Sequence, residues 1–497
     1  MFYKNKISMQ NNIFKLINFL VIFGLIISHK SFADDIKQKT FNNKESEEVS
    51  HTYSSEHYTQ NDFSVEEEEI EAAKLKNLYI SPFNYTQNPV AYSMGTTTQA
   101  GPNGTYQVGL SVIGSGNIPL NGVNSTFNVD AFQVWGQTGR WNGFALGGTV
   151  QGVQTIRQVG QPNTFEPYSV LAPTQAYINY QQPDLFQITA GNILLNTPWV
   201  NSLDNVPGAT FANTNNTFLG FTANVQLLPS LILMGFHAYS YLQYPYSFPN
   251  AQNLYNTYGG PLANMGSNAT NMGVTGVGTR WNPGNGYRAR LWFYQFVDYA
   301  NMWYFENSYN LALSKDYSMD FGFQAFNQSS GDNSITTYTP LPGANTPAGI
   351  ISSNGIGLKW VINIPHDTIS VSYNNIFGPD NSFLNGGMLT PYTYGLETDP
   401  LYTTPALTSL AELGSGSAYT IRNSWRAIEN KLTFNVSYSQ FFTNQAYGGQ
   451  PNAPINEWDA AMIYNWDSHF NVWTRLVYLD APSAPMWQPR IIFNYSF

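Results

Sequence analysis

The sequence predicts an all-β protein, a transmembrane antiparallel β-barrel of about 18 strands with short periplasmic turns and long extracellular loops. Three observations lead to this class: the composition, the alternation of residues along short segments, and the lengths of the connections. Of the 497 residues, 10% are charged and 15% are aromatic, whereas about 25% of residues in a typical soluble protein are charged. A chain with so few charges needs surfaces that meet something other than water. Helical membrane spans are excluded because no run reaches about 18 consecutive apolar residues.

The alternation of apolar and polar residues is clear in the segment 432–440. Leu432, Phe434 and Val436 alternate there with uncharged polar residues. Successive side chains of a strand point to opposite faces, so one face of this strand is apolar and the other is polar. A soluble sandwich alternates too, but its outer face would carry Lys and Glu. Uncharged polar faces on segments of about ten residues are therefore typical of a membrane barrel.

Segments of this kind occur along the chain from about residue 105. They are 105–113, 126–135, 142–151, 174–181, 186–192, 216–226, 230–240, 271–280, 288–298, 301–311, 317–327, 354–362, 367–374, 416–423, 432–440, 457–465, 469–479 and 488–497. The connections after even-numbered segments are all short, and those after odd-numbered segments are mostly long. A barrel inserted from one side needs this sorting, because short turns stay in the periplasm and long loops project outward.

The N-terminus has the features of a secretory signal peptide. Lys4 and Lys6 precede the apolar stretch 16–27, and small residues lead up to an expected cleavage site after Ala33. A membrane anchor is the alternative, although the stretch is short for a span. We therefore assign residues 1–33 to a signal peptide.

The region after the signal peptide differs in composition from the rest of the chain. Residues 34–90 form an acidic periplasmic N-terminal extension, in which 64–77 has strong helix formers and predicts a short helix. A solvated tail is the alternative. The transmembrane β-barrel then occupies residues 91–497.

Charged side chains on the strands are expected to face the interior, because a cation in the middle of a bilayer costs roughly 2–4 kcal/mol. Arg288 and Arg290, for example, alternate with Ala289 and Leu291. The residues that we expect to line a water-filled pore are Arg288, Arg290, Asp298, Glu306, Asp320, Lys359, Arg422, Arg426, Glu457, Asp459 and Arg475. The alternative for any one of them is a buried ion pair or a position at the periplasmic rim.

The connection 192–217 is the best candidate for a loop that folds inward and narrows the pore. It is interrupted by Pro198 and Pro207, and it is rich in Asn and Thr but poor in charge. Long loops in a compact protein usually have a function.

In this loop the sequence resembles the OprD family of substrate-specific outer-membrane porins. The family motif is an L-x-T-P stretch, then an Asn or Ser followed by Asp, then a Pro followed by Thr-Phe. Leu195, Thr197, Pro198, Asp204, Pro207, Thr210 and Phe211 match it in order, while Val206 stands where the family usually has an Arg. The resemblance implies a barrel for small, often carboxylate-bearing solutes. It also implies that Thr197, Pro198, Asp204, Pro207, Thr210 and Phe211 belong to the constriction loop.

These observations predict a porin in the outer membrane of a Gram-negative bacterium. It would be a channel for passive or facilitated diffusion of small hydrophilic solutes such as amino acids, peptides or carboxylates. An outer-membrane adhesin or structural barrel with binding loops is the alternative. An enzyme is not expected, because the sequence has no G-x-S-x-G or H-E-x-x-H motif and His237, His366 and His469 are isolated from one another.

No cofactor or metal is expected, and the absence of Cys excludes disulfides and thiolate ligands. The expected partners are outer-membrane lipid and lipopolysaccharide, small solutes, and the barrel assembly machinery, whose recognition signal the terminal Phe497 resembles. A homotrimer is a further candidate assembly. Nucleic acid is excluded because the net charge is -10 and no basic stripe occurs.

Overall fold

A computed structural model describes most of the predicted barrel. The described residues are 105–120, 125–159, 169–182, 185–195, 197–202, 217–242, 252–253, 273–297, 299–314, 316–331, 350–390, 392, 399–429, 431–444, 446–447, 450–451, 453–467, 470–482 and 485–496. The predicted signal peptide, the acidic extension and the barrel region up to residue 104 lie outside the described residues.

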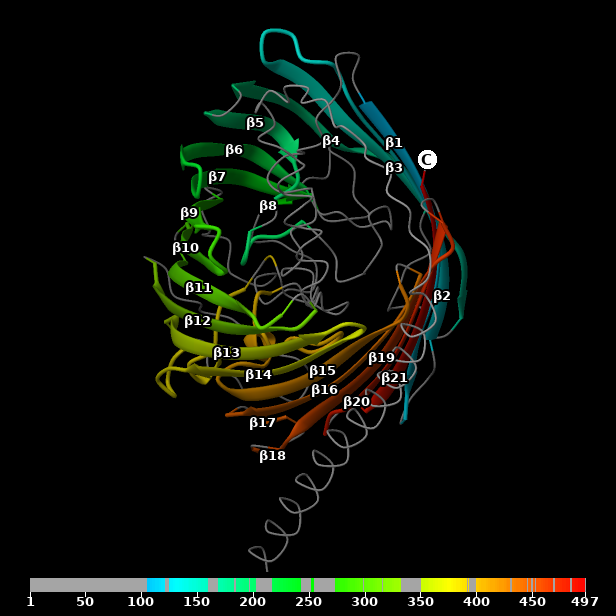
Figure 1. The fold of residues 1–497 in the computed structure, drawn as a ribbon. Helices are drawn as coiled ribbons and strands as arrows, with labels where there is room; N and C mark the ends of the chain where they lie inside the picture. Colours follow the sequence, from blue (N-terminus) through cyan, green and yellow to red (C-terminus); the bar gives the residue numbers. More distant parts are fainter. Residues whose placement is uncertain are drawn as a thin grey trace, which may run out of the picture. The chain divides into compact units, whose positions relative to one another are not determined.

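The described strands pair in chain order, each antiparallel to its neighbour, except for the short β8, β17 and β18 (Figure 1). They are β1 (Thr105–Pro119), β2 (Ser125–Gln137), β3 (Phe144–Val159), β4 (Ser169–Gln182), β5 (Phe186–Ile193), β6 (Thr217–Leu228), β7 (Leu231–Leu242), β8 (Gln252–Asn253), β9 (Val274–Trp281), β10 (Tyr287–Phe296), β11 (Ala300–Ala312), β12 (Ser318–Ser330), β13 (Ser352–Ile364), β14 (Asp367–Phe377), β15 (Gly416–Ile428), β16 (Leu432–Thr443), β17 (Ala446–Tyr447), β18 (Gln450–Pro451), β19 (Ile455–Asn465), β20 (Phe470–Asp480) and β21 (Met486–Ser496). Because β21 also pairs with β1, the sheet closes on itself.

Eighteen of the described strands form this closed sheet, as predicted. The two-residue β8 pairs only with β7, and β17 with β18 forms a separate hairpin. Each predicted segment coincides with one strand of the closed sheet. Several strands are longer than predicted, and β1 runs on through Gly114 and Gly116. The sequence pattern misses such strand ends because a glycine has no side chain to contribute to the alternation.

The two ends of the sheet differ in their connections. At the short-turn end these are 138–143, 183–185, 229–230, 282–286, 313–317, 365–366, 429–431 and 466–469. At the long-loop end they include 160–168, 194–216, 243–273, 331–351, 378–415 and 444–454, whereas 120–124, 297–299 and 481–485 are short. The expected sorting therefore holds for every turn at the first end, and the second end has three exceptions.

The outward face of the sheet is apolar and carries aromatic side chains near both ends. Leu291, Leu358 and Val436 are among the exposed apolar residues between the ends. The exposed aromatic residues are Trp141, Trp281, Tyr309, Tyr317, Trp425 and Trp466 near the short-turn end, and Tyr239, Trp303, Phe377, Tyr419, Trp458 and Trp487 near the long-loop end. An apolar band between two aromatic girdles is the pattern of a membrane-spanning barrel.

Helices are short in the described part of the chain. The 378–415 connection contains a 3-10 helix, η3 (Phe383–Asn385), and one α-helical turn, α3 (Leu410–Leu413). Among the described residues, no helix has the length and apolar character needed to span a membrane.

The main apolar core lies on the inner side of the sheet. Trp292, Tyr294 and Phe296 of β10 face inward and are at most 2% exposed, whereas Leu291 on the opposite face is 42% exposed. The rings of Phe296 and Tyr392, a residue of the 378–415 connection, stack with centroids 6.1 Å apart. The inner face is therefore not uniformly polar, because long connections bring their own apolar side chains inside.

Candidate functional site

Two segments of the long connections lie buried against the inner face of the sheet. The first, the 194–202 segment, follows β5, and the second, the 399–408 segment, precedes α3. Trp199 in the first segment and Tyr402 in the second are both 0% exposed. The interior of the sheet is thus closed in part by the chain's own connections.

The 194–202 segment satisfies polar groups within itself. The N–H and the hydroxyl of Thr197 both donate to the carbonyl of Val200, at 3.0 and 2.9 Å. Ser202 donates its N–H to the carbonyl of Leu195 at 2.7 Å, and its hydroxyl accepts from the Leu195 N–H at 2.8 Å. Because these main-chain groups are already paired, the segment can bury its apolar side chains against the sheet without leaving those groups unsatisfied.

Aromatic packing holds the 194–202 segment in place. The ring of Trp199 lies edge-on to Tyr304 and to Phe326, with centroid distances of 6.0 and 5.8 Å. These contacts belong to the main apolar core. Edge-to-face pairs of this kind add about 0.5–1.5 kcal/mol beyond the burial of their area.

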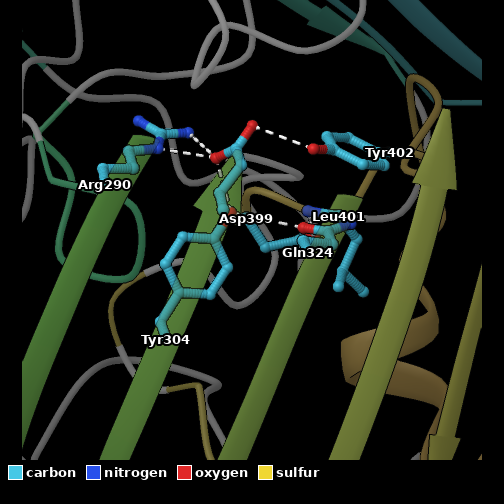
Figure 2. Close-up of polar contacts among 7 residues, drawn as sticks. Arg290, Tyr304, Gln324, Asp399, Leu401 and Tyr402 are labelled. Atoms are coloured by element: carbon cyan, nitrogen blue, oxygen red, sulfur yellow. Dashed lines mark hydrogen bonds and ion pairs between the residues drawn. The ribbon is translucent and has the colours of Figure 1, made fainter. Parts of the chain in front are cut away.

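The 399–408 segment is organised by Asp399. One oxygen of its carboxylate accepts from the N–H of Leu401 at 3.0 Å (Figure 2). The same oxygen accepts from the hydroxyl of Thr404 at 2.7 Å. Burial raises the pKa of the Asp399 carboxyl above its usual value, while hydrogen bonds from Ser409 and Thr404 oppose that rise. The carboxylate therefore fixes the bend of the main chain between residues 399 and 404.

Arg422 of β15 holds the main chain of this segment to the wall. Its two terminal nitrogens donate to the carbonyls of Tyr402 and Thr404, at 2.9 and 2.5 Å. Arg422 is 1% exposed. Its guanidinium thus uses the forked geometry in which arginine grips paired oxygen atoms.

Thr403 lies between the two residues that Arg422 holds, and two polar side chains of the sheet contact it. Asn374 of β14 accepts from both the N–H and the hydroxyl of Thr403, each at 3.1 Å. The hydroxyl of Thr420 on β15 donates to the Thr403 carbonyl at 2.8 Å. The N–H and the C=O of Thr403 are therefore both paired with side chains of the sheet.

Glu457 of β19 and Arg475 of β20 contact the next part of the segment. One oxygen of Glu457 accepts from the N–H of Ala406 at 2.9 Å and from that of Leu407 at 2.7 Å. Arg475 donates to the Ala406 carbonyl at 3.5 Å and to Gln488 of β21 at 2.8 Å. The acidic side chain thus accepts from N–H groups of the segment, and the basic side chain donates to one of its C=O groups.

Glu306 of β11 is the centre of a charged cluster beside the segment. Arg290 forms an ion pair with it, and its Nε donates to Oε2 at 2.6 Å. The hydroxyls of Tyr304 and Tyr402 also donate to Glu306, at 2.7 and 3.2 Å. Figure 2 shows Arg290 and Tyr402 on opposite sides of one carboxylate. The ammonium of Lys359 lies 4.5 Å from the centre of the Tyr402 ring, a cation–π contact.

The cluster remains partly open, in contrast to the docked segment. The side chains of Arg290 and Glu306 are 27% and 13% exposed. Burial and the charge of Glu306 raise the pKa of the Tyr402 hydroxyl well above its usual value, so this hydroxyl stays a neutral donor. The arrangement places a cation and an anion side by side, both partly exposed.

The other predicted pore residues take different positions. Arg422, Glu457, Asp459 and Arg475 face inward but are at most 3% exposed, because the 399–408 segment covers this part of the wall. Asp459 accepts from the hydroxyl of Ser437 at 2.6 Å. These four residues therefore hold a connection in place and do not present exposed charges to the interior.

The remaining predicted charges lie toward the short-turn end. Arg288 and Arg426 are half-buried there, and Arg426 donates to the carbonyl of Pro365 at 3.0 Å. Asp320 is 8% exposed and accepts from Asn310 and from Asn363, each at 2.9 Å. Asp298 lies outside the described residues.

The predicted constriction loop is described only at its start. Thr197 and Pro198 are buried inside the sheet. Asp204, Pro207, Thr210 and Phe211 lie outside the described residues.

Sequence reasoning overlooked the second inward segment and one arginine. The 375–415 connection was the longest one predicted, and this length was the available signal for a second inward loop. Arg280 of β9 is half-buried and lies directly opposite Arg290 of β10. Because Arg280 is the last residue of the predicted strand 271–280, its position was the available signal that it belongs to the sheet.

Comparison with known proteins supports the fold. No protein-family model and no curated protein matches the sequence. Solved structures do match, among them Pseudomonas aeruginosa OccK8 (OprE), with a TM-score of 0.63, 12% identity, and coverage of 79% of this chain and 98% of that chain. P. aeruginosa OccK9 (OpdG) matches with a TM-score of 0.62, 12% identity, and coverage of 79% and 98%. P. aeruginosa OprD matches with a TM-score of 0.57, 13% identity, and coverage of 82% and 99%. The chain therefore has the fold of the OprD-type porins that its loop motif resembles.

Proposed function

We propose that this protein is a channel through which small hydrophilic solutes diffuse across the outer membrane of a Gram-negative bacterium. The observation that carries the proposal is the closed sheet of eighteen described strands, with an apolar outward face and charged side chains inside. Barrels of about 16–18 strands are wide enough to enclose an aqueous channel. The likeness of fold to OprD supports the same conclusion.

The charged cluster around Glu306 favours small zwitterions or carboxylates, such as amino acids, as solutes. Arg280, Arg288 and Arg290 are half-buried on the inner side of β9 and β10, and Lys359 lies nearby on β13. Within a low-dielectric wall their combined field is poorly screened and raises the local concentration of anionic groups. Glu306 supplies the neighbouring negative charge that an ammonium group needs.

Planar bilayer recordings test this proposal. The protein is expected to open as a pore, and replacing both Arg288 and Arg290 by Ala should shift its reversal potential toward cations at low salt. Arg426→Ala is the matched control, because Arg426 lies at the short-turn end and contacts the Pro365 carbonyl. A smaller shift is expected for it, because Arg426 lies on β15, away from Glu306 and the arginines of β9 and β10.

Two outcomes would contradict the proposal in different ways. If the protein does not conduct in several lipid compositions, the adhesin or structural barrel becomes the better interpretation. If it conducts but the double variant keeps the selectivity of the unaltered protein, Arg288 and Arg290 do not face the permeation path.

A further inference from the structure

We propose that part of the inner face is a binding site for the main chain of short peptides, and that the protein's own 399–408 segment occupies this site. The proposal rests on the proposed channel function and names one class of solute for it. We call the surface the docking wall, and its side chains are Gln324, Asn374, Thr420, Arg422, Glu457 and Arg475. Each of them is at most 3% exposed.

The docking wall supplies donors to successive carbonyls of the segment. The donors and acceptors are Arg422 to Tyr402 and Thr404, Thr420 to Thr403, and Arg475 to Ala406. The charged donors form the stronger type of hydrogen bond. All of these contacts end on main-chain oxygen atoms.

The docking wall also supplies acceptors to the N–H groups. Asn374 accepts from Thr403, and Glu457 accepts from Ala406 and Leu407. When the Gln324 amide is oriented to satisfy its neighbours, its oxygen accepts from the Tyr402 N–H at 3.0 Å and its nitrogen donates to the Pro400 carbonyl at 3.1 Å. The wall thus contacts main-chain N–H or C=O groups of six of the eight residues 400–407, while Leu401 is paired within the segment.

Contacts of this kind are indifferent to most side chains of the bound segment. Every peptide carries the same N–H and C=O groups, so a wall that pairs with them can accept other sequences. Two glycines let the wall residues and the segment come close. A Cβ atom on Gly357 would lie 2.3 Å from Nδ2 of Asn374, and one on Gly322 would lie 3.0 Å from the hydroxyl of Tyr402.

The docking wall differs from the surroundings of the other buried segment in how many main-chain groups it pairs. A buried segment must pair its main-chain groups, and the 194–202 segment pairs several of them with its own atoms. The 399–408 segment pairs the N–H groups of Leu401 and Thr404 internally, but it gives main-chain groups of residues 402, 403, 406 and 407 to side chains of the sheet. A free peptide that docks there regains the same hydrogen bonds, while the tethered segment competes at an effective concentration of about the millimolar range.

Thiol labelling tests the exchange directly, because the chain has no cysteine. A Thr404→Cys variant places a single thiol at a position that is 0% exposed while the segment is docked. The probe is the blocked peptide acetyl-Ala-Ala-Ala-amide, added to the full-length protein in detergent micelles. A water-soluble methanethiosulfonate should label the thiol about tenfold faster when the peptide stands near ten times its dissociation constant.

Three controls make the experiment specific. The same peptide with methylated amide nitrogens cannot donate to Glu457 or Asn374, so it should leave the labelling rate unchanged. An Asp316→Cys variant, with its thiol in an exposed short turn, should label at one rate with or without peptide. If Thr404→Cys does not fold, Ala406→Cys carries the same measurement, because Ala406 is also 0% exposed.

The result also separates this proposal from the channel function. An equal effect of the peptide and its methylated analogue, or no effect of either at high millimolar concentration, would overturn the docking wall as a peptide site. Peptide-dependent labelling of a protein that never conducts would support the site and overturn the channel. Conduction without peptide-dependent labelling would support the channel and overturn the peptide site.

Discussion

The 194–202 and 399–408 segments are both buried inside the sheet, but they are held there by opposite means. The first pairs several of its main-chain groups internally and packs Trp199 against Tyr304 and Phe326. The second gives its main-chain groups to Arg422 and other side chains of the docking wall. The comparison teaches that side chains specify the first segment, whereas the wall specifies the second.

The largest effect is expected from Trp199→Ala. Removing a fully buried indole leaves a cavity among aromatic neighbours, and such changes cost about 3–5 kcal/mol. The free energy of unfolding in denaturant, measured in detergent micelles, should fall by that amount. Trp466→Ala is the control, because this indole is 64% exposed, belongs to the outer aromatic girdle and does not contact the first segment, so its loss should cost far less. Equal costs for the two variants would mean that the first segment is not held by its side chains.

Arg422→Met should release the second segment and leave the first in place. The variant removes two hydrogen bonds from a charged donor, each contributing about 1.5–3 kcal/mol, and leaves two buried carbonyls without it. Hydrogen exchange followed by mass spectrometry should show faster exchange across residues 399–408 and unchanged exchange across 194–202. Similar acceleration in both segments would remove the distinction between them.

Tyr402→Phe is expected to have a smaller effect. It removes the hydroxyl that donates to Glu306 at 3.2 Å, but it keeps the ring under the ammonium of Lys359. One such hydrogen bond contributes about 1 kcal/mol, so exchange in the 399–408 segment should rise roughly fivefold. An effect as large as that of Arg422→Met would show that this hydroxyl, and not the main chain, is the principal anchor.

The smallest effect is a pH dependence that Asp399 gives to docking. Its pKa is raised in the docked segment, so the docked state binds this proton more tightly than the released state. Docking should therefore be strongest below the ordinary aspartate value of about 3.9, weaken as the pH rises through the raised value, and then level off. Hydrogen exchange corrected for its intrinsic pH dependence measures this trend, and Asp399→Asn should abolish it. Docking that strengthens as the pH rises would contradict the assignment of this pH dependence to Asp399.

The sequence predicts the sheet far better than it predicts what lies inside the sheet. Alternation located each strand, because a strand with one face toward lipid repeats every two residues. The same parity assigned Arg422 and Glu457 to the inner face, and both side chains are buried there. It gave no sign that a segment covers them, because the contacts go to main-chain groups that every residue shares. Likewise, the burial of Trp292 inside the sheet depends on contacts between segments far apart in the sequence.

The pairing of β1 with β21 has a consequence for how the chain folds. Gly109, near the start of the described chain, lies opposite Ser496, near its end. A ribosome delivers the first of these strands long before the last, so the exposed edge of β1 must wait for nearly the whole chain. Unpaired edges are templates for aggregation, and contacts so distant in sequence form slowly. Closure of this seam is therefore the step at which a newly made chain most needs protection, and variants that weaken β21 should reduce the yield of closed barrel more than its stability once closed.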